Sequence, residues 1–276
     1  MVLCLLSNDD SQYAQFVQLN NGELIAGPTI KLIDDTFNGK PLLLNGEGVA
    51  FSNEYFYVIG SHGRPRGIGP KEIDEALRAR NAANSQIVRF KMTAQLDPAS
   101  AVVERTSRLS KIIAAEPALA PFMGQWPENN GVIIEGIAID GRGETLFAGF
   151  RGPILNGSRA AILGVRIDVL FGGSGTAHRL FRLPLGGRGV RDLAIFEGRI
   201  LILAGPSSSV PGRYAIYSWD GESNDVKLLS ELPFDPARKP EGLLPLGKEG
   251  PGHLRVLVMF DAEKEGAPTP IKIKLP

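Results

Sequence analysis

The chain has 276 residues, and its 30 basic and 30 acidic residues give a formal net charge of zero at neutral pH. This balance lacks the positive surface that non-specific nucleic-acid binding requires, so we expect no nucleic-acid partner. Hydrophobic residues make up 43% of the chain and charged residues 22%, which is typical of a folded globular protein. The 33 glycines and 20 prolines are scattered between short apolar runs and favour an all-β fold with many turns.

The chain begins with a short apolar run, Val2 to Leu6, which holds the only cysteine, Cys4. A lone cysteine cannot form an internal disulfide, and we expect it to pack in the core. The run is too short for a membrane span or a signal peptide. We therefore expect no membrane association and a cytoplasmic protein, or a periplasmic one if the native start lies upstream and carries a signal peptide.

The first structural unit is predicted from this run and the two segments after it. Val2 to Leu6 is interpreted as the second strand of a four-stranded unit, and residues 7–10 as its tip. Tyr13 to Leu19 and Thr29 to Ile33 then form the third and fourth strands. This first unit has no innermost strand in the sequence as given.

Four further units start with the same pattern, in which an acidic residue opens a small apolar strand and a turn leads to a second apolar strand. The first strands are Gly46–Ala50, Ile134–Ala138, Arg191–Ile195 and Pro240–Leu244. The second strands are Tyr55–Ile59, Thr145–Gly149, Ile200–Ala204 and Arg255–Met259. Turn-forming residues such as Ser52 and Asn53 separate the members of each pair.

Third and fourth strands complete most of these units. The predicted third strands are Gln86–Met92, Ala160–Ile167, Arg213–Trp219 and Ile271–Leu275, and the fourth strands are Ala101–Glu104, His178–Leu183 and Val226–Leu232. The shorter steps between the acidic positions fit the roughly 40–50-residue period of propeller blades. The longer step, from Glu47 to Glu135, contains two predicted short helical insertions, Pro70–Ala82 and Thr106–Glu116, which we place between the second and third units.

Together these repeats predict a single β-propeller domain that spans residues 1–276. Five units are visible, and a sixth would exist only in a longer parent chain. Because the first and last units have three strands each, we expect the two termini to meet where the ring closes. We expect a monomer that binds a small-molecule ligand or substrate.

The acidic residues of the units are expected to share one rim of the central channel. In a hairpin the start of the first strand lies beside the end of the second. This pairing places four carboxylates on the rim: Glu47, Glu135, Asp192 and Glu241. It also places further polar residues beside them: Asp9, His62, Arg64, Arg151 and Asp261.

Converging carboxylates repel one another unless something compensates their charge. Three interpretations of the rim stay open. Glu47, Glu135, Asp192 and Glu241 could bind a hard cation such as Ca²⁺. A metal could also act together with arginines to hold an anionic substrate, which is a variant of this metal-centred interpretation. In the second interpretation Arg64 and Arg151 neutralise the carboxylates without a metal. In the third interpretation the acidic residues only cap backbone amides, and the glycine that follows most of them allows close strand packing.

His62 is the best titratable candidate for a chemical role, because the Gly60 to Arg64 segment follows a strand at the same rim. His62, Arg64 and Arg151 are therefore the candidate catalytic residues. The chain has no Gly-x-Ser-x-Gly or His-Glu-x-x-His motif, so a serine-hydrolase elbow or a zincin site is not indicated.

Several of these segments together resemble an uncharacterised bacterial family, domain of unknown function 3616. The resemblance rests on Glu47 to Ala50, Tyr57 to Arg64, Ile134 to Ala138 and Phe150 to Leu155. That family is similar in blade pattern to esterase-like phytases and calcium-dependent lactonase propellers, which implies a propeller fold more than a reaction. The chain departs from the pattern at Asp192 and Leu193, where Glu-Gly is expected.

The leading functional hypothesis is a hydrolase-like propeller that acts on a small ester or phosphoester at the acidic rim, with a possible requirement for Ca²⁺. The alternative is a non-catalytic propeller that binds a ligand or a protein partner on the same rim. The sequence alone does not choose between an enzyme and a binding module.

Overall fold

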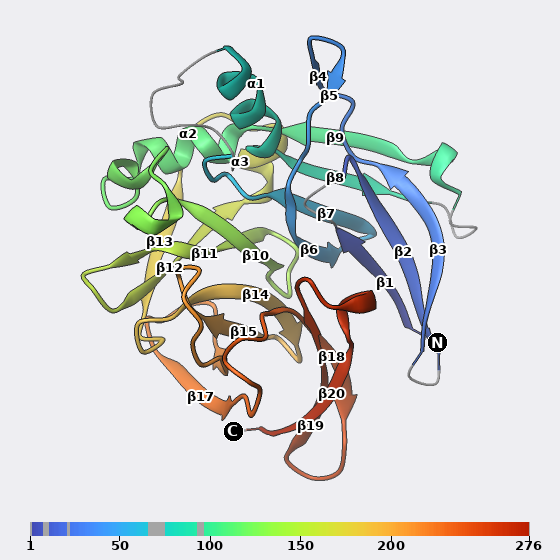
Figure 1. The fold of residues 1–276 in the computed structure, drawn as a ribbon, viewed down its shortest axis with the longest axis vertical. Helices are drawn as coiled ribbons and strands as arrows, with labels where there is room; N and C mark the ends of the chain where they lie inside the picture. The colour runs from blue at the N-terminus through green and yellow to red at the C-terminus, as the bar shows by residue number, and fades with distance from the viewer. Residues whose placement is uncertain (1, 8–10, 21–22, 66–74, 93–96, 276) are drawn as a thin grey trace.

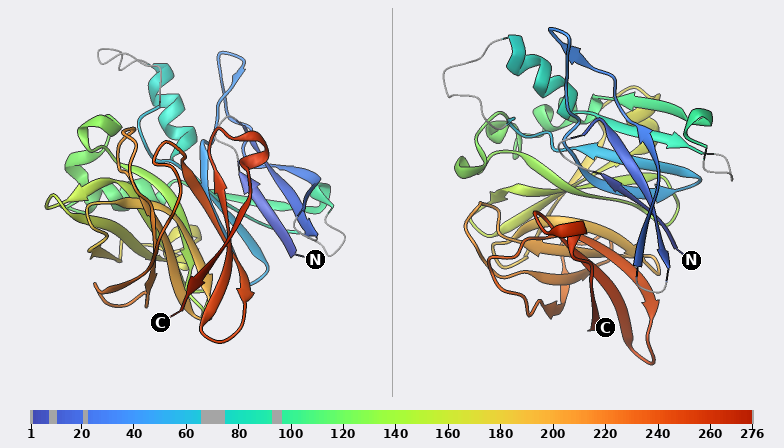
Figure 2. Two further views of the ribbon diagram at one scale, coloured as in Figure 1. Left: turned by 60° about the horizontal axis from the view of Figure 1, so that its bottom comes forward. Right: turned by 45° about the vertical axis from the view of Figure 1, so that its right-hand side comes forward.

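A computed structural model describes residues 2–7, 11–20, 23–65, 75–92 and 97–275 of the chain. Its main feature is a ring of five antiparallel sheets, which follow one another around a central axis in chain order (Figure 1). The views in Figure 2 show the sheets standing face to face around this axis. The chain is therefore a five-bladed β-propeller, as predicted.

The sheets take their strands from the chain in order, from the innermost outward. The first sheet contains β1 (Val2–Ser7), β2 (Tyr13–Asn20) and β3 (Glu23–Lys31). The second contains β6 (Gly46–Ser52), β7 (Tyr55–Gly60), β8 (Ile87–Lys91) and β9 (Val102–Thr106). The third contains β10 (Ile133–Ile139), β11 (Thr145–Leu155), β12 (Arg159–Arg166) and β13 (His178–Leu183).

The fourth sheet contains β14 (Gly189–Phe196), β15 (Arg199–Gly205), β16 (Ala215–Trp219) and β17 (Val226–Glu231). The fifth contains β18 (Pro240–Lys248), β19 (His253–Phe260) and β20 (Thr269–Lys274). A small hairpin, β4 (Thr36–Phe37) and β5 (Lys40–Pro41), projects between the first and second sheets (Figure 1).

The direction of β1 matches the prediction that it corresponds to a second strand. Its last residue, Ser7, lies against Gly46, which opens β6. The strand therefore runs opposite to the innermost strand β6, as the second strand β7 does. The first and fifth sheets each have three strands among the described residues, in agreement with the sequence.

The middle strands are apolar because both faces of each sheet are covered by neighbouring sheets. In β15 every residue after Arg199 is buried, whereas no residue of the outermost strand β17 is buried. Buried side chains form four clusters, one between each successive pair of sheets from the first to the fifth. No sheet has a hydrophobic core of its own, so the stability of each blade depends on its neighbours.

Aromatic side chains anchor two of these interfaces. Phe16 packs edge-on against Phe56 and Phe90, with ring centroids 5.3 and 6.3 Å away, which joins the first sheet to the second. Trp219 packs against Phe147 at 5.2 Å, which joins the fourth sheet to the third. Such pairs add roughly 0.5–1.5 kcal/mol each beyond the effect of burying their surface.

Three α-helices decorate the ring: α1 (Glu75–Asn84), α2 (Arg108–Ala115) and α3 (Ile167–Phe171). Short 3₁₀ turns occur at Pro98–Ser100, Ala120–Phe122, Pro127–Asn129 and Lys264–Gly266. The predicted helices overlap α1 and α2, although residues 70–74 of the first lie outside the described part of the chain. Helix α1 lies within the second unit, between β7 and β8, rather than between the second and third units as predicted.

No described helix has the length and apolar character needed to cross a membrane.

Candidate functional site

The innermost strands of the second to fifth sheets share one irregularity near their first residue. In β6, Gly46 pairs with Gly60 and Gly48 with Ile59, so Glu47 is left out of the ladder. The same two-against-one bulge occurs in β10, β14 and β18. The four residues at the bulge position are Glu47, Glu135, Arg191 and Glu241. At a β-bulge the side chain points in a different direction from the side chains of the regular pleat. All four of these side chains line a cavity on the propeller axis.

The structure corrects the sequence prediction at the fourth sheet. Asp192, predicted as the fourth rim carboxylate, pairs with Leu203, and it is Arg191 that occupies the bulge. A shift of one residue along a strand moves a side chain to the opposite face. Asp192 does not line the cavity, because its side chain turns towards the neighbouring blade.

Asp192 joins the fourth sheet to the fifth. Its carboxylate oxygens accept hydrogen bonds at 2.7 Å from the backbone N–H of Leu193 and at 2.7 Å from that of Leu243, on β18. Burial raises the pKa of this carboxyl to about 7, although the two amide donors favour its charged form. At Asp192 the geometry therefore agrees with the third interpretation of the rim, in which the acidic residues cap backbone amides.

The glycines that follow the bulge in β6 and β10 allow the inner strands to pack closely. A Cβ atom on Gly136 would lie 2.8 Å from the backbone nitrogen of Leu193, and one on Gly48 would lie 2.9 Å from that of Ile137. Real Cβ atoms do not approach backbone atoms so closely. The sequence predicted this role for the glycines, and the structure shows it at both positions.

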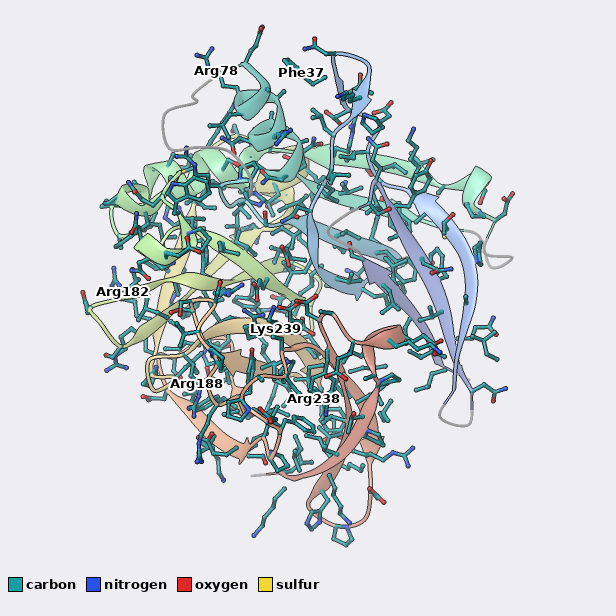
Figure 3. The ribbon with its side chains drawn as sticks, in the orientation of Figure 1. Phe37, Arg78, Arg182, Arg188, Arg238 and Lys239 are labelled. Atoms are coloured by element: carbon teal, nitrogen blue, oxygen red, sulfur yellow. The ribbon has the colours of Figure 1, made fainter. Side chains whose placement is uncertain are left out.

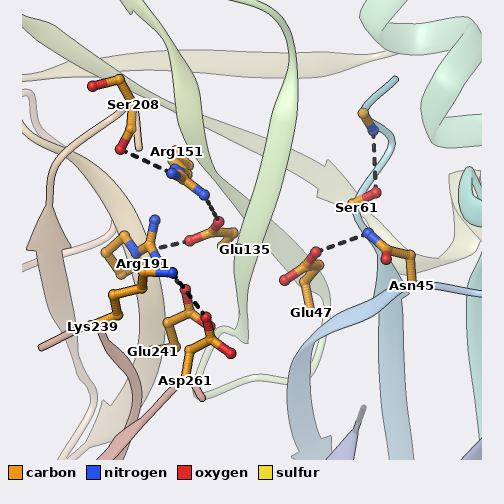
Figure 4. A network of polar contacts seen from close by, with 11 residues as sticks. Asn45, Glu47, Ser61, Glu135, Arg151, Arg191, Ser208, Lys239, Glu241 and Asp261 are labelled. Carbon is orange, nitrogen blue, oxygen red and sulfur yellow. Dashed lines mark hydrogen bonds and ion pairs between the residues drawn. The ribbon is translucent and has the colours of Figure 1, made fainter. Parts of the chain in front are cut away.

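At the centre of the site, Arg191 bridges two carboxylates (Figure 4). The Nε atom of Arg191 lies 3.0 Å from Oε2 of Glu135, and its Nη2 pairs with Oε1 of Glu241. The other oxygen of Glu135 pairs with Nη1 of Arg151 at 2.9 Å, and Nη2 of Arg151 donates to the carbonyl of Ser208, also at 2.9 Å. Glu135 thus sits between two arginines, and Arg191 between two glutamates.

The charges of this network are set by burial and pairing. Arg191 is 2% exposed. Burial lowers its pKa, but Glu135 and Glu241 more than offset this, so the guanidinium stays charged. Burial raises the pKa of Glu241 to about 7, and Glu135 adds to the rise, while Arg191 opposes it. Glu241 therefore changes its protonation state near neutral pH, and its side chain is still 33% exposed towards the cavity.

The cavity has a volume of about 790 Å³, enough for a small organic ligand. Its walls carry residues from the second to the fifth sheets. Lys239 and Asp261, of the fifth, form an ion pair at 3.4 Å. Figure 3 shows Lys239 near the centre of the ring, whereas Arg78 and Arg182 lie at its margin. The predicted rim residue Asp9 lies outside the described residues.

Arg64 lines the cavity, as predicted. Its guanidinium lies over the ring of Trp126, 4.4 Å from the centroid, and its Nη1 donates to the carbonyl of Gly124 at 3.2 Å. This stacking fixes the orientation of the cationic group at the wall. Arg151 also lines the cavity, but its Nη1 and Nη2 already donate to Glu135 and to the carbonyl of Ser208.

His62 follows β7 as expected, but its ring does not line the cavity. It is 8% exposed, adopts a positive φ of 53°, and its Nδ1 lies 2.8 Å from the carbonyl oxygen of Gly60. Burial lowers the pKa of this imidazole to about 4, so it is neutral at physiological pH. Its backbone turns the ring into the protein, so the predicted catalytic residue takes no part in the arrangement at the axis.

The residues at the axis do not fit the predicted calcium site. No group of three or more acidic, histidine or cysteine side chains in the described part of the chain is arranged to hold a metal ion. Glu135, the most buried carboxylate, has an arginine at each oxygen. Arginine therefore compensates the carboxylates here, which favours the second of the three interpretations of the rim. Calcium binding itself stays a prediction.

Arg191 and Tyr214, which both line the cavity, are among the contributors that the sequence did not reveal. Arg191 stands directly before Asp192, and counting residue pairs from the turn cannot reveal a bulge. Tyr214 falls inside the predicted strand Arg213–Trp219 but lies just before β16, and no repeated residue type marks its position. A search for one charged side chain per unit, of either sign, would have found Arg191.

Comparisons with solved structures give two distant likenesses. An exo-β-1,3-galactanase from Phanerochaete chrysosporium, solved with β-1,3-galactotriose, has a TM-score of 0.49 and 10% identity, and the match covers 99% of this chain. The chain spans 60% of the galactanase chain. A putative 6-phosphogluconolactonase from Bacteroides fragilis has a TM-score of 0.42 and 10% identity. This match covers 99% of the present chain and 80% of the lactonase chain. No curated protein matches the chain.

A family model described as "Protein of unknown function (DUF3616)" matches residues 74–269. The matched segment includes Glu135, Arg191 and Glu241. The family that the sequence motifs indicated is thus found again by a model that covers more than half of the chain. The chain belongs to the DUF3616 family of proteins of unknown function.

Proposed function

We propose that the axial cavity binds a small ester or phosphoester and hydrolyses it by general acid–base catalysis. The observation that supports this most is the Glu135–Arg191–Glu241 cluster, in which a partly exposed carboxyl group with a raised pKa faces a cavity of about 790 Å³. A group whose pKa lies near the working pH can both accept and donate a proton in a reaction.

In this proposal each residue of the cluster has a separate task. Glu241 accepts a proton from the attacking water and returns it to the leaving oxygen. Arg191 holds Glu241 in place, and Glu135 with Arg151 holds Arg191 from the other side. Arg64, whose guanidinium stacks on Trp126 at the cavity wall, would contact the phosphate group of a phosphoester substrate.

The proposed function is tested by replacing Glu241 with Gln, which keeps the shape of the side chain but removes its proton exchange. We expect wild-type protein to hydrolyse 4-nitrophenyl acetate or 4-nitrophenyl phosphate with a kcat/KM that rises as the pH increases through about 7. The variant Glu241→Gln is expected to lose 10²- to 10⁴-fold in kcat/KM, in line with the usual contribution of a general acid or base.

The matched control is Glu231→Gln, which removes an ion pair with Arg188 at the outer edge of the fourth sheet. This variant is expected to keep the wild-type rate and pH profile. Equal rates for Glu241→Gln and wild type, or an unchanged pH profile, would contradict the role of Glu241.

A second candidate function, ligand binding without catalysis, is favoured by one observation. Leu43 and Val210 line the cavity with exposed side chains, 39% and 69% accessible respectively. Ligand pockets usually combine an apolar lining with a small number of polar groups. Saturable binding of a small ligand by a protein that hydrolyses none of the tested esters or phosphoesters would support this candidate.

A further inference from the structure

Tyr214 is a buried tyrosine whose hydroxyl group has no hydrogen bond to any described residue, although it lines the axial cavity. The residue is 6% exposed, and its backbone carbonyl is fixed by a hydrogen bond from the N–H of Leu232 at 2.8 Å. A tyrosine hydroxyl usually has a hydrogen-bond partner when the residue is buried, whereas this one is open to the cavity and is not among the side-chain atoms sealed from solvent. Tyr217, equally buried, shows the usual case: its hydroxyl donates to the carbonyl of Leu185 and accepts from Arg188.

The phenol of Tyr214 lies beside the charged network on the axis. Gly205 leaves the room that its ring occupies, since a Cβ atom there would overlap the ring. Burial raises the pKa of the phenol, Arg191 opposes this, and Glu241 adds to the rise. The hydroxyl therefore stays protonated at neutral pH and is a hydrogen-bond donor in the cavity next to Arg191 and Glu241.

We propose that the hydroxyl of Tyr214 donates a hydrogen bond to the carbonyl oxygen of an uncharged carboxylic ester, and to the oxyanion that replaces this oxygen during hydrolysis. This inference rests on the proposed function and names its substrate class. A donor placed where negative charge develops is a common source of rate acceleration.

The charges at the axis favour a carboxylic ester over a phosphate monoester. Three carboxylates reach the cavity from the bulge positions: Glu47, Glu135 and Glu241. Of the cations in the lining, Arg151 and Arg191 already pair with Glu135 and Glu241, and Lys239 pairs with Asp261. A phosphate dianion would add two negative charges to this group, whereas an ester enters uncharged. The single oxyanion forms as Glu241 takes up a proton, so the net charge of the group stays the same, and Tyr214 donates a hydrogen bond to the oxyanion.

The reaction balances with the residues present. Glu241, as carboxylate, takes one proton from water while the water oxygen bonds to the carbonyl carbon, and the carbonyl oxygen becomes the oxyanion. The carbon–oxygen bond to the leaving group then breaks as the carbonyl re-forms, and Glu241 returns its proton to the leaving oxygen. The products are a carboxylic acid and an alcohol or phenol.

The experiment compares wild type with Tyr214→Phe, which removes only the hydroxyl. We expect kcat for 4-nitrophenyl acetate to fall 10- to 1000-fold with little change in KM, as is usual when one oxyanion donor is lost. Wild type should also prefer 4-nitrophenyl acetate to 4-nitrophenyl phosphate by at least about tenfold in kcat/KM, the ratio that about 1.4 kcal/mol provides. Because the hydroxyl has no partner among the described residues, the melting temperature should stay unchanged.

A binding measurement separates this inference from the proposed function. Titration calorimetry with 4-nitrophenyl methylphosphonate, a tetrahedral monoanion that mimics the oxyanion, should show weaker binding to Tyr214→Phe than to wild type. This readout remains valid if wild type hydrolyses no ester, which would refute the proposed function alone. Equal affinity and equal kcat in both proteins would refute the role of Tyr214, and faster hydrolysis of the phosphate would refute the substrate class.

The control is Tyr217→Phe, which removes a hydroxyl that is bonded within the protein and lies outside the cavity lining. It is expected to lower the melting temperature and to leave the affinity for the methylphosphonate unchanged. A loss of affinity in this control as large as in Tyr214→Phe would mean that general destabilisation, and not the cavity hydroxyl, explains the result.

Discussion

At the scale of single residues, one position along β14 decides what the fourth blade contributes to the axis. Arg191 occupies the bulge and Asp192 the next position, so the cationic side chain enters the cavity and the carboxylate bonds to the adjacent blade. The residue types at the site were predicted from the sequence for Glu47, Glu135 and Glu241. The arginine at the fourth position could not be predicted, because counting residue pairs from a turn assumes a strand ladder without a bulge.

The buried carboxyl of Asp192 should make stability depend on pH. Its pKa is raised from 3.8 to about 7 in the folded state, so the folded state binds the proton more tightly than the unfolded one. Its contribution to stability is therefore full below about pH 4 and is lost as the pH rises through about 7. The upper limit of the loss is about 4 kcal/mol, from about three pKa units.

The variant Asp192→Asn removes this titration. We expect its free energy of unfolding, measured in urea between pH 4 and 8, to fall less with pH than that of wild type. Asp225→Asn, at an exposed position, serves as the control and should follow the wild-type slope. Parallel slopes for Asp192→Asn and wild type would contradict the assignment of a raised pKa to Asp192.

At the scale of elements, the hairpin signals in the sequence predicted most of the strands. Strand β13 was predicted at its observed bounds, and the predicted helices correspond to α1 and α2. Helix α3 was missed, because its apolar run Ile167–Phe171 follows β12 directly and is too short to show a helical period. Strand β11 is longer than predicted, because it continues past Arg151 and Pro153 to Leu155. Glycine and proline there indicated a turn, which the tertiary pairing overrides.

The close contact between the inner strands β10 and β14 gives a test at this scale. In Gly136→Ala the new methyl group would lie 2.8 Å from backbone atoms of Asp192 and Leu193. This overlap can be relieved only if strand β10 or strand β14 moves. We expect a loss of about 1–3 kcal/mol in the free energy of unfolding. The measurement is a urea denaturation curve at a fixed pH.

Gly141→Ala is the matched control for this substitution. Gly141 lies in the turn between β10 and β11, and a Cβ atom there would meet nothing within 4 Å. This control should change the free energy of unfolding by no more than about 0.5 kcal/mol, as surface substitutions usually do. If the two alanine variants were equally stable, the inner strands would not be in the tight contact described.

At the scale of the whole molecule, the repeat predicted the ring, the number of blades and the place of the site. The hydrophobic clusters each belong to two successive sheets, so we expect residues 1–276 to behave as one domain. The sequence could not show how the carboxylates are compensated. This depends on arginines from two different blades, Arg151 and Arg191, meeting one glutamate at the axis.

This compensation predicts the response of the whole protein to calcium. Glu135 is held by arginines at both oxygens and Glu241 by Arg191. We therefore expect calorimetric titration of metal-stripped protein with Ca²⁺ to give no saturable heat at millimolar concentrations. Saturable heat that disappears in Glu135→Gln would instead support the calcium site predicted from the sequence.

The bulge at the start of each inner strand has a consequence for how this molecule can be re-engineered. Each of the second to fifth blades sends one side chain to the axis, and this side chain takes no part in the strand ladder. The backbone hydrogen bonds of the ladders therefore do not depend directly on which side chain stands at these four positions. Because Glu135, Arg191 and Glu241 are paired with one another, a redesign of the cavity has to change them together so that no buried charge is left without a partner.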